Sequence, residues 1–426
     1  MSVGQDVGGA GADIAVPVRP GRRQAAFGFI FATSVMNALS FGLMIPVLPL
    51  LLKSFVAGDT AVAALWQTVF ALTWGAMQFF AGPVLGLASD RFGRRPILLI
   101  SLFGLAADFM IMALAPNLGW LFLGRVLNGL TASSGSTGNA YLVDVTPPED
   151  RARRFGMLGS AFSFGFLLGP ILGGYLAGFS LRLPFVVAAG LALANALYGV
   201  FILPESLPRE RRVEAFALRR ANPLASLGFL RAHGGLGRFA SMNFLLQLQQ
   251  NVWPMVYVLY VSHRYHWTSA VTGLVMMISG VAGIGVQMGL VGPVVRRIGE
   301  RGAVVLGVSF GAIGMTIYGW APTSLIYFVG LPFNVLAGFA IPGLMALMTN
   351  RVGMAEQGQL QGANQALVGI ASIVGPLVYG PIFAWALTTE AALHAPGAPF
   401  YVAALAYAGV LLLSFGVRRR PALQPA

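Results

Sequence analysis

The chain has 426 residues, of which 57% are hydrophobic and only 10% are charged. Soluble domains carry about 25% charged residues, so this composition excludes an ordinary water-soluble fold and indicates a protein embedded in a lipid bilayer. The absence of cysteine excludes disulfide bonds. A formal net charge of +13 is compatible with nucleic acid as a partner, unless the position of the charges explains it in another way.

Long apolar runs recur along the whole chain. About 20 helical residues span the hydrocarbon core, because each residue adds about 1.5 Å and the core is about 30 Å thick. Twelve runs satisfy this length: 26–51, 61–86, 96–115, 118–143, 155–179, 183–203, 239–261, 270–295, 302–321, 323–347, 360–386 and 399–416. They are too long for barrel strands, so the sequence predicts an all-α membrane protein with 12 transmembrane helices.

The basic residues lie almost entirely on one side of this predicted topology. With the N-terminus in the cytoplasm, 23 of the 27 Lys and Arg residues fall in cytoplasmic segments. This positive-inside asymmetry explains the net charge without nucleic acid and predicts that both termini are cytoplasmic. We therefore expect a multi-pass protein of the bacterial inner membrane.

The predicted helices fall into two halves separated by a polar, Arg-rich linker. We expect a disordered cytoplasmic tail, an N-terminal six-helix bundle, a cytoplasmic linker, a C-terminal six-helix bundle and a second tail, at 1–24, 25–203, 204–238, 239–417 and 418–426 respectively. The halves match at a constant offset of 206 residues, which pairs Gly93 with Gly299 and Asn128 with Asn334, for example. Six spans per half make this a parallel repeat, with a pathway between the halves.

The loop after the second predicted span has a distinctive pattern, Gly86-Leu87-Ala88-Ser89-Asp90-Arg91-Phe92-Gly93-Arg94-Arg95. It resembles the conserved cytoplasmic loop of the major facilitator superfamily. The resemblance implies a cytoplasmic gate that latches the two halves together, formed by Gly86, Asp90, Arg91, Gly93, Arg94, Arg95 and, after the fourth span, Asp144. An ordinary basic turn that only obeys the topology rule is the alternative.

The fifth span carries regularly spaced small residues. Gly156, Gly165, Gly169, Pro170, Gly173 and Gly174 allow neighbouring helices to approach closely. Their spacing resembles the antiporter motif of drug–proton exporters in the same superfamily, which implies export. Simple helix packing is the alternative.

Further segments resemble the tetracycline-exporter branch of this superfamily. They are residues 43–49, the pair Gly124 and Arg125, and residues 356–362. Two acidic positions of that branch differ here, because Asn37 stands in the first helix and Gly311 lies near the expected position in the ninth. The resemblance implies a small amphipathic, drug-like substrate that could resemble tetracycline.

One acidic residue, Asp108, lies well inside an apolar span, and Arg125 is the one base inside a span. A rise of about 1.5 Å per residue places the two at similar depths in adjacent helices. We predict that they form the proton-coupling site, in which Asp108 carries the proton and Arg125 competes for its deprotonated form. A permanent structural ion pair is the alternative.

Neutral amides mark the helices that line the central cavity in the superfamily. We predict a hydrogen-bonding substrate cavity lined by Asn37, Asn128, Asn243, Gln247, Gln250 and Asn334. The alternative is that these amides form interhelical hydrogen bonds that hold the bundle together.

The sequence therefore predicts a proton-coupled antiporter that works by alternating access, as a monomer, on a small-molecule substrate. A major facilitator importer or uniporter of a small neutral metabolite is the competing prediction. We expect neither enzymatic activity nor a catalytic residue. The only lysine is Lys53, so the chain lacks a phosphate-binding loop for ATP. No cofactor and no metal site are expected, since the proton gradient supplies the energy.

Overall fold

A computed structural model describes residues 20–213, 227–232, 235–353, 356–388 and 396–416. Helices dominate this part of the chain, and its described residues contain no β-strand. The predicted all-helical fold is confirmed. The predicted tail at 418–426 lies outside the described residues, as do residues 1–19 of the other tail.

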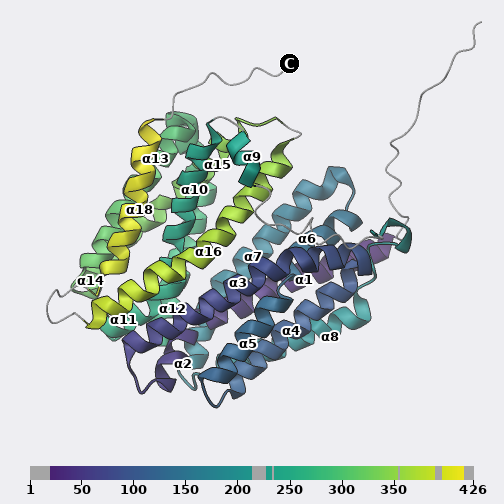
Figure 1. The fold of residues 1–426 in the computed structure, drawn as a ribbon, viewed down its shortest axis with the longest axis horizontal. Coiled ribbons are helices and arrows are strands. Elements are labelled where there is room, and N and C mark those ends of the chain that lie inside the picture. Colours follow the sequence, from purple (N-terminus) through teal and green to yellow (C-terminus); the bar gives the residue numbers. More distant parts are fainter. Residues whose placement is uncertain (1–19, 214–226, 233–234, 354–355, 389–395, 417–426) are drawn as a thin grey trace, which may run out of the picture.

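The first bundle contains eight helical segments that build six spans (Figure 1). These are α1 (Pro20–Met44) with α2 (Leu48–Phe55), α3 (Thr60–Phe92), α4 (Arg94–Leu114), α5 (Leu118–Thr131) with α6 (Ser134–Val145), α7 (Pro148–Ala177) and α8 (Leu183–Ile202). The first helix begins at Pro20 and not after residue 24, so the predicted end of the tail is wrong. Proline suits the first turn of a helix, where its missing N–H has no intrahelical partner.

A linking region follows, with the 3-10 turn η1 (Arg209–Arg211) and the short helix α9 (Leu227–Ala232). The second bundle then builds six further spans. They are α10 (Leu236–Gln250) with η3 (Trp253–Tyr257) and α11 (Val258–Tyr265), α12 (Ser269–Gly285) with η4 (Val286–Leu290), α13 (Val291–Trp320), α14 (Ser324–Leu336) with η5 (Ala337–Phe339) and α15 (Ala340–Thr349), α16 (Gln357–Thr388) and α18 (Ala398–Phe415). Residues 291–298 of α13 complete the span that starts at Ser269.

The twelve predicted spans are all present as helices. Nine described helical stretches are long and apolar enough to cross a membrane by themselves. One of them, Ser269–Trp320, contains two predicted spans, because the helices meet at a kink at Gly299. The other two spans, 118–145 and 236–265, are interrupted within the bilayer and are therefore shorter as continuous α-helices.

The repeat is visible in the backbone. Gly93 and its counterpart Gly299 both have positive φ angles, 108° and 74°, which only glycine adopts at little cost. Ala132 and Ser133, which separate α5 from α6, correspond at the same offset to Gly338 and Phe339 of η5. The two halves therefore bend at equivalent places, as expected for structural repeats.

The two bundles contact each other mainly through two helix pairs, α3 with α16 and α7 with α12. The contacts extend from the ends of these helices that are far from the Arg-rich loops to about the middle of the helices. Thr68 of α3 faces Gly380 of α16, and Gly174 of α7 faces Ser269 of α12. Toward the Arg-rich end, Gly156 and Gly283 have no atom near the position of a Cβ.

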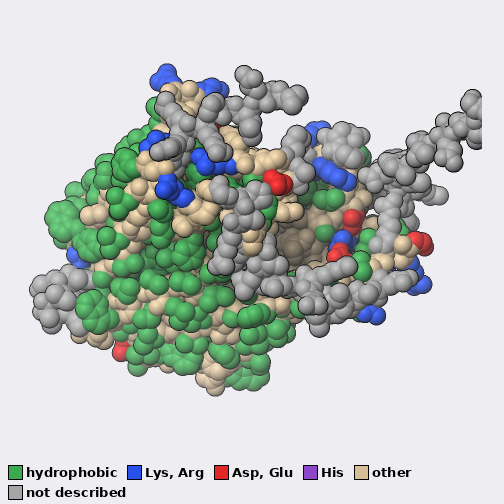
Figure 2. All heavy atoms as spheres, turned by 45° about the horizontal axis from the view of Figure 1, so that its top comes forward, with side chains coloured by type: hydrophobic (Ala, Val, Ile, Leu, Met, Phe, Trp, Pro, Cys, Tyr) green, Lys and Arg blue, Asp and Glu red, His purple; other side chains and the backbone are tan. Residues whose placement is uncertain are grey.

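We call the side with the Arg-rich loops the basic face. In Figure 2 the basic side chains gather on this face, which is hollowed between the bundles, while the flank below it is largely hydrophobic. Large apolar side chains such as Phe201, Met288 and Leu412 are 72–83% exposed on the helices. An apolar flank bounded by a charged face fits a protein that is embedded in a bilayer.

Candidate functional site

The loop between α3 and α4 is built around Gly93. This residue ends α3 and precedes α4, and its φ of 108° reverses the chain. A Cβ at this position would lie 2.2 Å from Oε2 of Glu205. Glycine is therefore required both for the backbone angle and for the approach of Glu205 to the start of α4.

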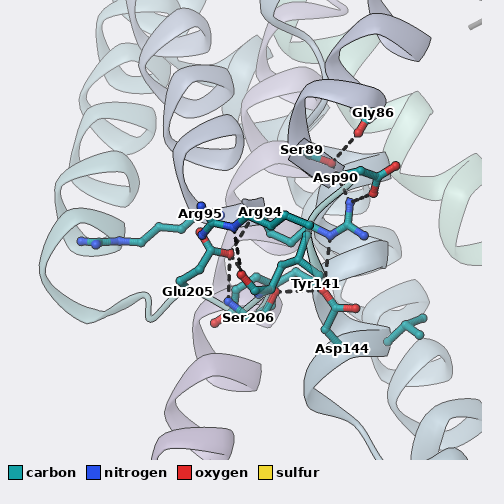
Figure 3. A network of polar contacts seen from close by, with 12 residues as sticks. Gly86, Ser89, Asp90, Arg94, Arg95, Tyr141, Asp144, Glu205 and Ser206 are labelled. Carbon is teal, nitrogen blue, oxygen red and sulfur yellow. Dashed lines mark hydrogen bonds and ion pairs between the residues drawn. The ribbon is translucent and has the colours of Figure 1, made fainter. Parts of the chain in front are cut away.

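Arg94 connects the two carboxylates of the predicted gate (Figure 3). Its Nη1 donates to Asp90 Oδ1 and, over 2.7 Å, to Ser89 Oγ. Its Nε lies 3.3 Å from Asp144 Oδ2. The predicted network of Asp90 and Asp144 thus exists, and Arg94 is the residue that bridges them.

The segment after α8 also belongs to this network, which the sequence reasoning missed. Glu205 Oε1 accepts the backbone N–H of Arg94 at 2.8 Å, and Ser206 Oγ donates to Asp144 Oδ2 at 3.0 Å (Figure 3). Tyr141 donates to the carbonyl of Pro204 at 2.9 Å. An acidic residue within an Arg-rich linker was the available signal. Glu205 supplies the negative charge that favours a helix N-terminus.

The other gate residues have smaller roles in this conformation. Arg95 Nη2 donates to the carbonyl of Val200 over 2.6 Å, and the Ser89 hydroxyl donates to the carbonyl of Gly86. The guanidinium of Arg91 lies over the ring of Phe92. Among the described residues, the partners in this network come from the first bundle and from the segment after α8, so the network stabilises one end of one half.

Asp108 of α4 and Arg125 of α5 form a buried ion pair through Arg125 Nη2 and Asp108 Oδ2. The Asp108 side chain is fully buried and that of Arg125 is 7% exposed. Gly124 makes the approach possible, because a Cβ there would lie 2.8 Å from Asp108 Oδ1. The guanidinium also lies 3.5 Å from the sulfur atoms of Met44 and Met112.

A central cavity lies between the two bundles beside this ion pair. Its lining includes Arg125, Gln67 and three aromatic side chains from the first bundle, with Asn251 and residues of η3 and α16 opposite. The full lining is Phe41, Met44, Ile45, Leu48, Gln67, Phe70, Ala71, Trp74, Arg125, Asn251, Pro254, Met255, Ser372 and Pro376. An aromatic wall with few polar groups is typical of a site for an amphipathic ligand.

The six amides predicted to line the substrate cavity do not line this one. Asn37 donates to Ser134, and Asn128 accepts from the indole of Trp74 at 2.7 Å. Asn243 is 1% exposed and donates to Asn364. In this conformation these three amides hold helices together, which is the alternative role considered for them.

The other three amides also lie away from the central cavity. Gln247 donates to Asn243 within α10 over 3.4 Å. Gln250 and Asn334 line a separate cavity between helices of the second bundle. Gln67, which does line the central cavity, is a polar residue within a predicted span that sequence reasoning did not single out.

The glycines of α7 pack against two helices. Cβ atoms at Gly165, Gly169 and Gly173 would lie 2.3–2.5 Å from backbone atoms of α1, and one at Gly174 would lie 2.3 Å from the carbonyl of Ser269 in α12. Ser269 also donates to the Gly174 carbonyl. Gly156 has open space around it. The motif therefore fixes α7 both within its own bundle and against the other.

Comparison with known proteins agrees with these features. The family model described as Major Facilitator Superfamily matches residues 30–376. The chain is 36% identical over 360 residues to the class C tetracycline resistance protein of Escherichia coli, covering 84% of this chain and 90% of the relative. It is 28% identical to multidrug resistance protein 2 of Bacillus subtilis (strain 168), covering 81% and 85% of the two chains.

Solved structures share the architecture. A D-xylose–proton symporter superposes with a TM-score of 0.72 at 19% identity, covering 94% of this chain and 98% of the symporter. The human organic anion transporter MFSD10 gives a TM-score of 0.65 at 23% identity, covering 93% of this chain and 100% of the transporter. At these identities the likeness concerns the fold.

Proposed function

Because the chain belongs to the major facilitator superfamily, we propose that it is a proton-coupled exporter of small amphipathic, drug-like molecules. The curated relatives named for tetracycline or multidrug resistance support export, as does the exporter-like spacing of glycines in α7. One observation carries the proposal: a buried carboxylate pairs with an arginine that lines a cavity between the two halves.

The proposed coupling uses this buried ion pair. Deprotonated Asp108 attracts Arg125, whereas a protonated Asp108 releases the guanidinium toward the cavity, where it meets the solute. Binding of a proton to Asp108 and binding of a solute are therefore linked through Arg125. No cofactor takes part, since the proton gradient supplies the work.

The proposal includes the orientation of the protein in the membrane. The basic face lies in the cytoplasm of a bacterium, with both termini on that side of the inner membrane. The structure then represents an inward-facing conformation of a monomer, because the bundles meet on the opposite side. Closure of the basic face would bring the Asp90–Arg94–Asp144 network against the second half as a latch.

Transport in proteoliposomes tests the function. Wild-type protein that has its basic face on the outside should drive uptake of tetracycline or a dye substrate into the proteoliposomes when the lumen is acidic, and an uncoupler should abolish the uptake. An Asp108→Asn variant should still equilibrate the solute without concentrating it. If Asp108→Asn concentrates solute under a pH gradient, the proposed role of Asp108 is contradicted. If wild-type transport does not depend on the pH gradient, proton coupling is contradicted.

A further inference from the structure

Gln67 spans the interface between the two bundles at the wall of the central cavity. It lies in α3, two turns from the helix start, and is 7% exposed. Its Nε2 donates to the carbonyl of Pro254 in η3 over 3.1 Å. A carbonyl oxygen only accepts, so this bond fixes which end of the amide is nitrogen.

The other end of the same amide is a buried acceptor. Among the described residues, Gln67 Oε1 has no hydrogen-bond partner, although the side chain lines the cavity. Buried polar atoms are almost always paired, because leaving one unpaired forfeits its interactions with water. A hydrogen-bond donor on a solute in the cavity would satisfy this oxygen.

Arg125 gives the same cavity a group of opposite character. Its side chain lines the cavity, and among the described residues its Nε has no acceptor. Guanidinium groups are donors only. Two side chains that line the cavity therefore carry unpaired groups, a buried acceptor on α3 and a buried donor on α5. A solute that has both a donor and an acceptor would match them.

The walls between these two groups are aromatic. Phe41, Phe70 and Trp74 line the cavity. The indole N–H of Trp74 is already donated to Asn128, so the ring and not its polar edge is available to a ligand. Aromatic walls favour flat aromatic bodies, through stacked or edge-to-face contacts.

We propose that the central cavity binds planar aromatic solutes which accept a hydrogen bond from Arg125 and donate one to Gln67 Oε1. This inference rests on the proposed function, because it takes the transported solute to be the occupant of the cavity. Gln67 then selects solutes by their donor group, while its Nε2 stays bound to the second bundle.

A matched pair of fluorescent probes tests the proposal. Umbelliferone is a planar lactone with a hydroxyl donor, and herniarin is its methyl ether, which lacks the donor. Binding of each to the purified full chain in detergent micelles is measured at one mildly acidic pH, where the hydroxyl keeps its proton. Wild type should bind umbelliferone about tenfold more tightly, a difference of about 1.4 kcal/mol.

The variants identify the residue responsible. Gln67→Met, which keeps an unbranched chain of similar length, should lower umbelliferone affinity about tenfold and leave herniarin affinity unchanged; Gln67→Leu serves in its place if the Met variant does not fold. The control is Thr73→Val in the same helix, because Thr73 bonds only to the carbonyl of Val69 and does not line the cavity. It should keep the wild-type preference.

Three results would overturn the proposal: no umbelliferone binding by wild type, no preference between the probes, or an equal loss of both probes in the Gln67 variants. Equilibrium binding needs no proton gradient. A chain that discriminates between the probes but fails to export would therefore contradict the proposed function alone, and a chain that exports without discriminating would contradict this inference alone.

Discussion

Gly124 lies directly beside Asp108, so that a Cβ on Gly124 would come within 2.8 Å of the carboxylate. The missing side chain lets Arg125, the next residue, reach the same carboxylate as its ion-pair partner. At the repeat offset, Asp108 corresponds to Gly314 and Gly124 to Gly330, and Gly314 packs against Gly330 and Asn334. The second half thus keeps the close helix contact and replaces the acid with glycine.

Removing one charge of the ion pair should destabilise the fold more than removing both. Asp108→Asn leaves Arg125 buried beside a neutral group, so we expect the free energy of unfolding to fall by about 3–5 kcal/mol. Asp108→Asn combined with Arg125→Gln removes both charges and should recover most of that loss. Thermal unfolding in detergent measures both variants.

Transport measurements on the same variants distinguish a structural role of the ion pair from a role in proton coupling. If the pair is only structural, the double variant should recover pH-driven export together with stability. If the pair couples protons, the double variant should be stable and still unable to concentrate solute. Recovery of active export in the double variant would therefore rule out the proposed proton carrier.

The close contact between α7 and α1 should not tolerate a methyl group at Gly169. A Cβ there would lie 2.5 Å from Gly42 Cα, so Gly169→Ala must displace the backbone, at a cost of about 1–3 kcal/mol. Gly159→Ala in the same helix faces open space and should be neutral or slightly stabilising, because alanine is the better helix former. Equal melting temperatures for the two variants would contradict this packing.

Glu205 should stabilise the start of α4. Its carboxylate accepts the N–H groups of Arg94, Ser206 and Leu207 at 2.8, 3.0 and 3.1 Å. Hydrogen bonds to charged groups contribute about 1.5–3 kcal/mol, so we expect Glu205→Ala to lower the unfolding free energy by roughly that amount. The exposed Glu210 provides the control, and Glu210→Ala should have no measurable effect. A Glu205→Ala variant as stable as Glu210→Ala would show that this cap is unimportant.

Local pattern was sufficient to predict the spans and the repeat. Apolar run length determines which segments can cross a bilayer, and glycine at 93 and 299 marks two backbone reversals that the structure shows at both places. The ion pair was also predictable, because a constant rise per residue gives the depth of Asp108 and Arg125 in neighbouring antiparallel helices.

Contacts that depend on helix rotation and on distant segments were not predictable. Asn243, Gln247 and Gln250 share a face by their spacing, yet Asn243 is buried against Asn364 and Gln250 lines a cavity of the second bundle. Periodicity groups residues on a face but does not say which neighbour that face meets. Glu205 was missed for a related reason, since its partner Arg94 lies 111 residues earlier in the chain.

Asn243 provides a last prediction that distinguishes helix packing from substrate binding. Its amide nitrogen donates to Asn364 Oδ1 over 3.1 Å in a buried contact between α10 and α16. Asn243→Ala removes this donor and leaves Asn364 less well paired, which should cost about 1–3 kcal/mol of stability. Trp74→Leu instead changes the wall of the central cavity, so it should weaken solute binding at least tenfold. Binding and thermal unfolding are measured on both proteins. A loss of solute affinity in Asn243→Ala, without a loss of stability, would show that Asn243 belongs to the substrate site, as the sequence predicted.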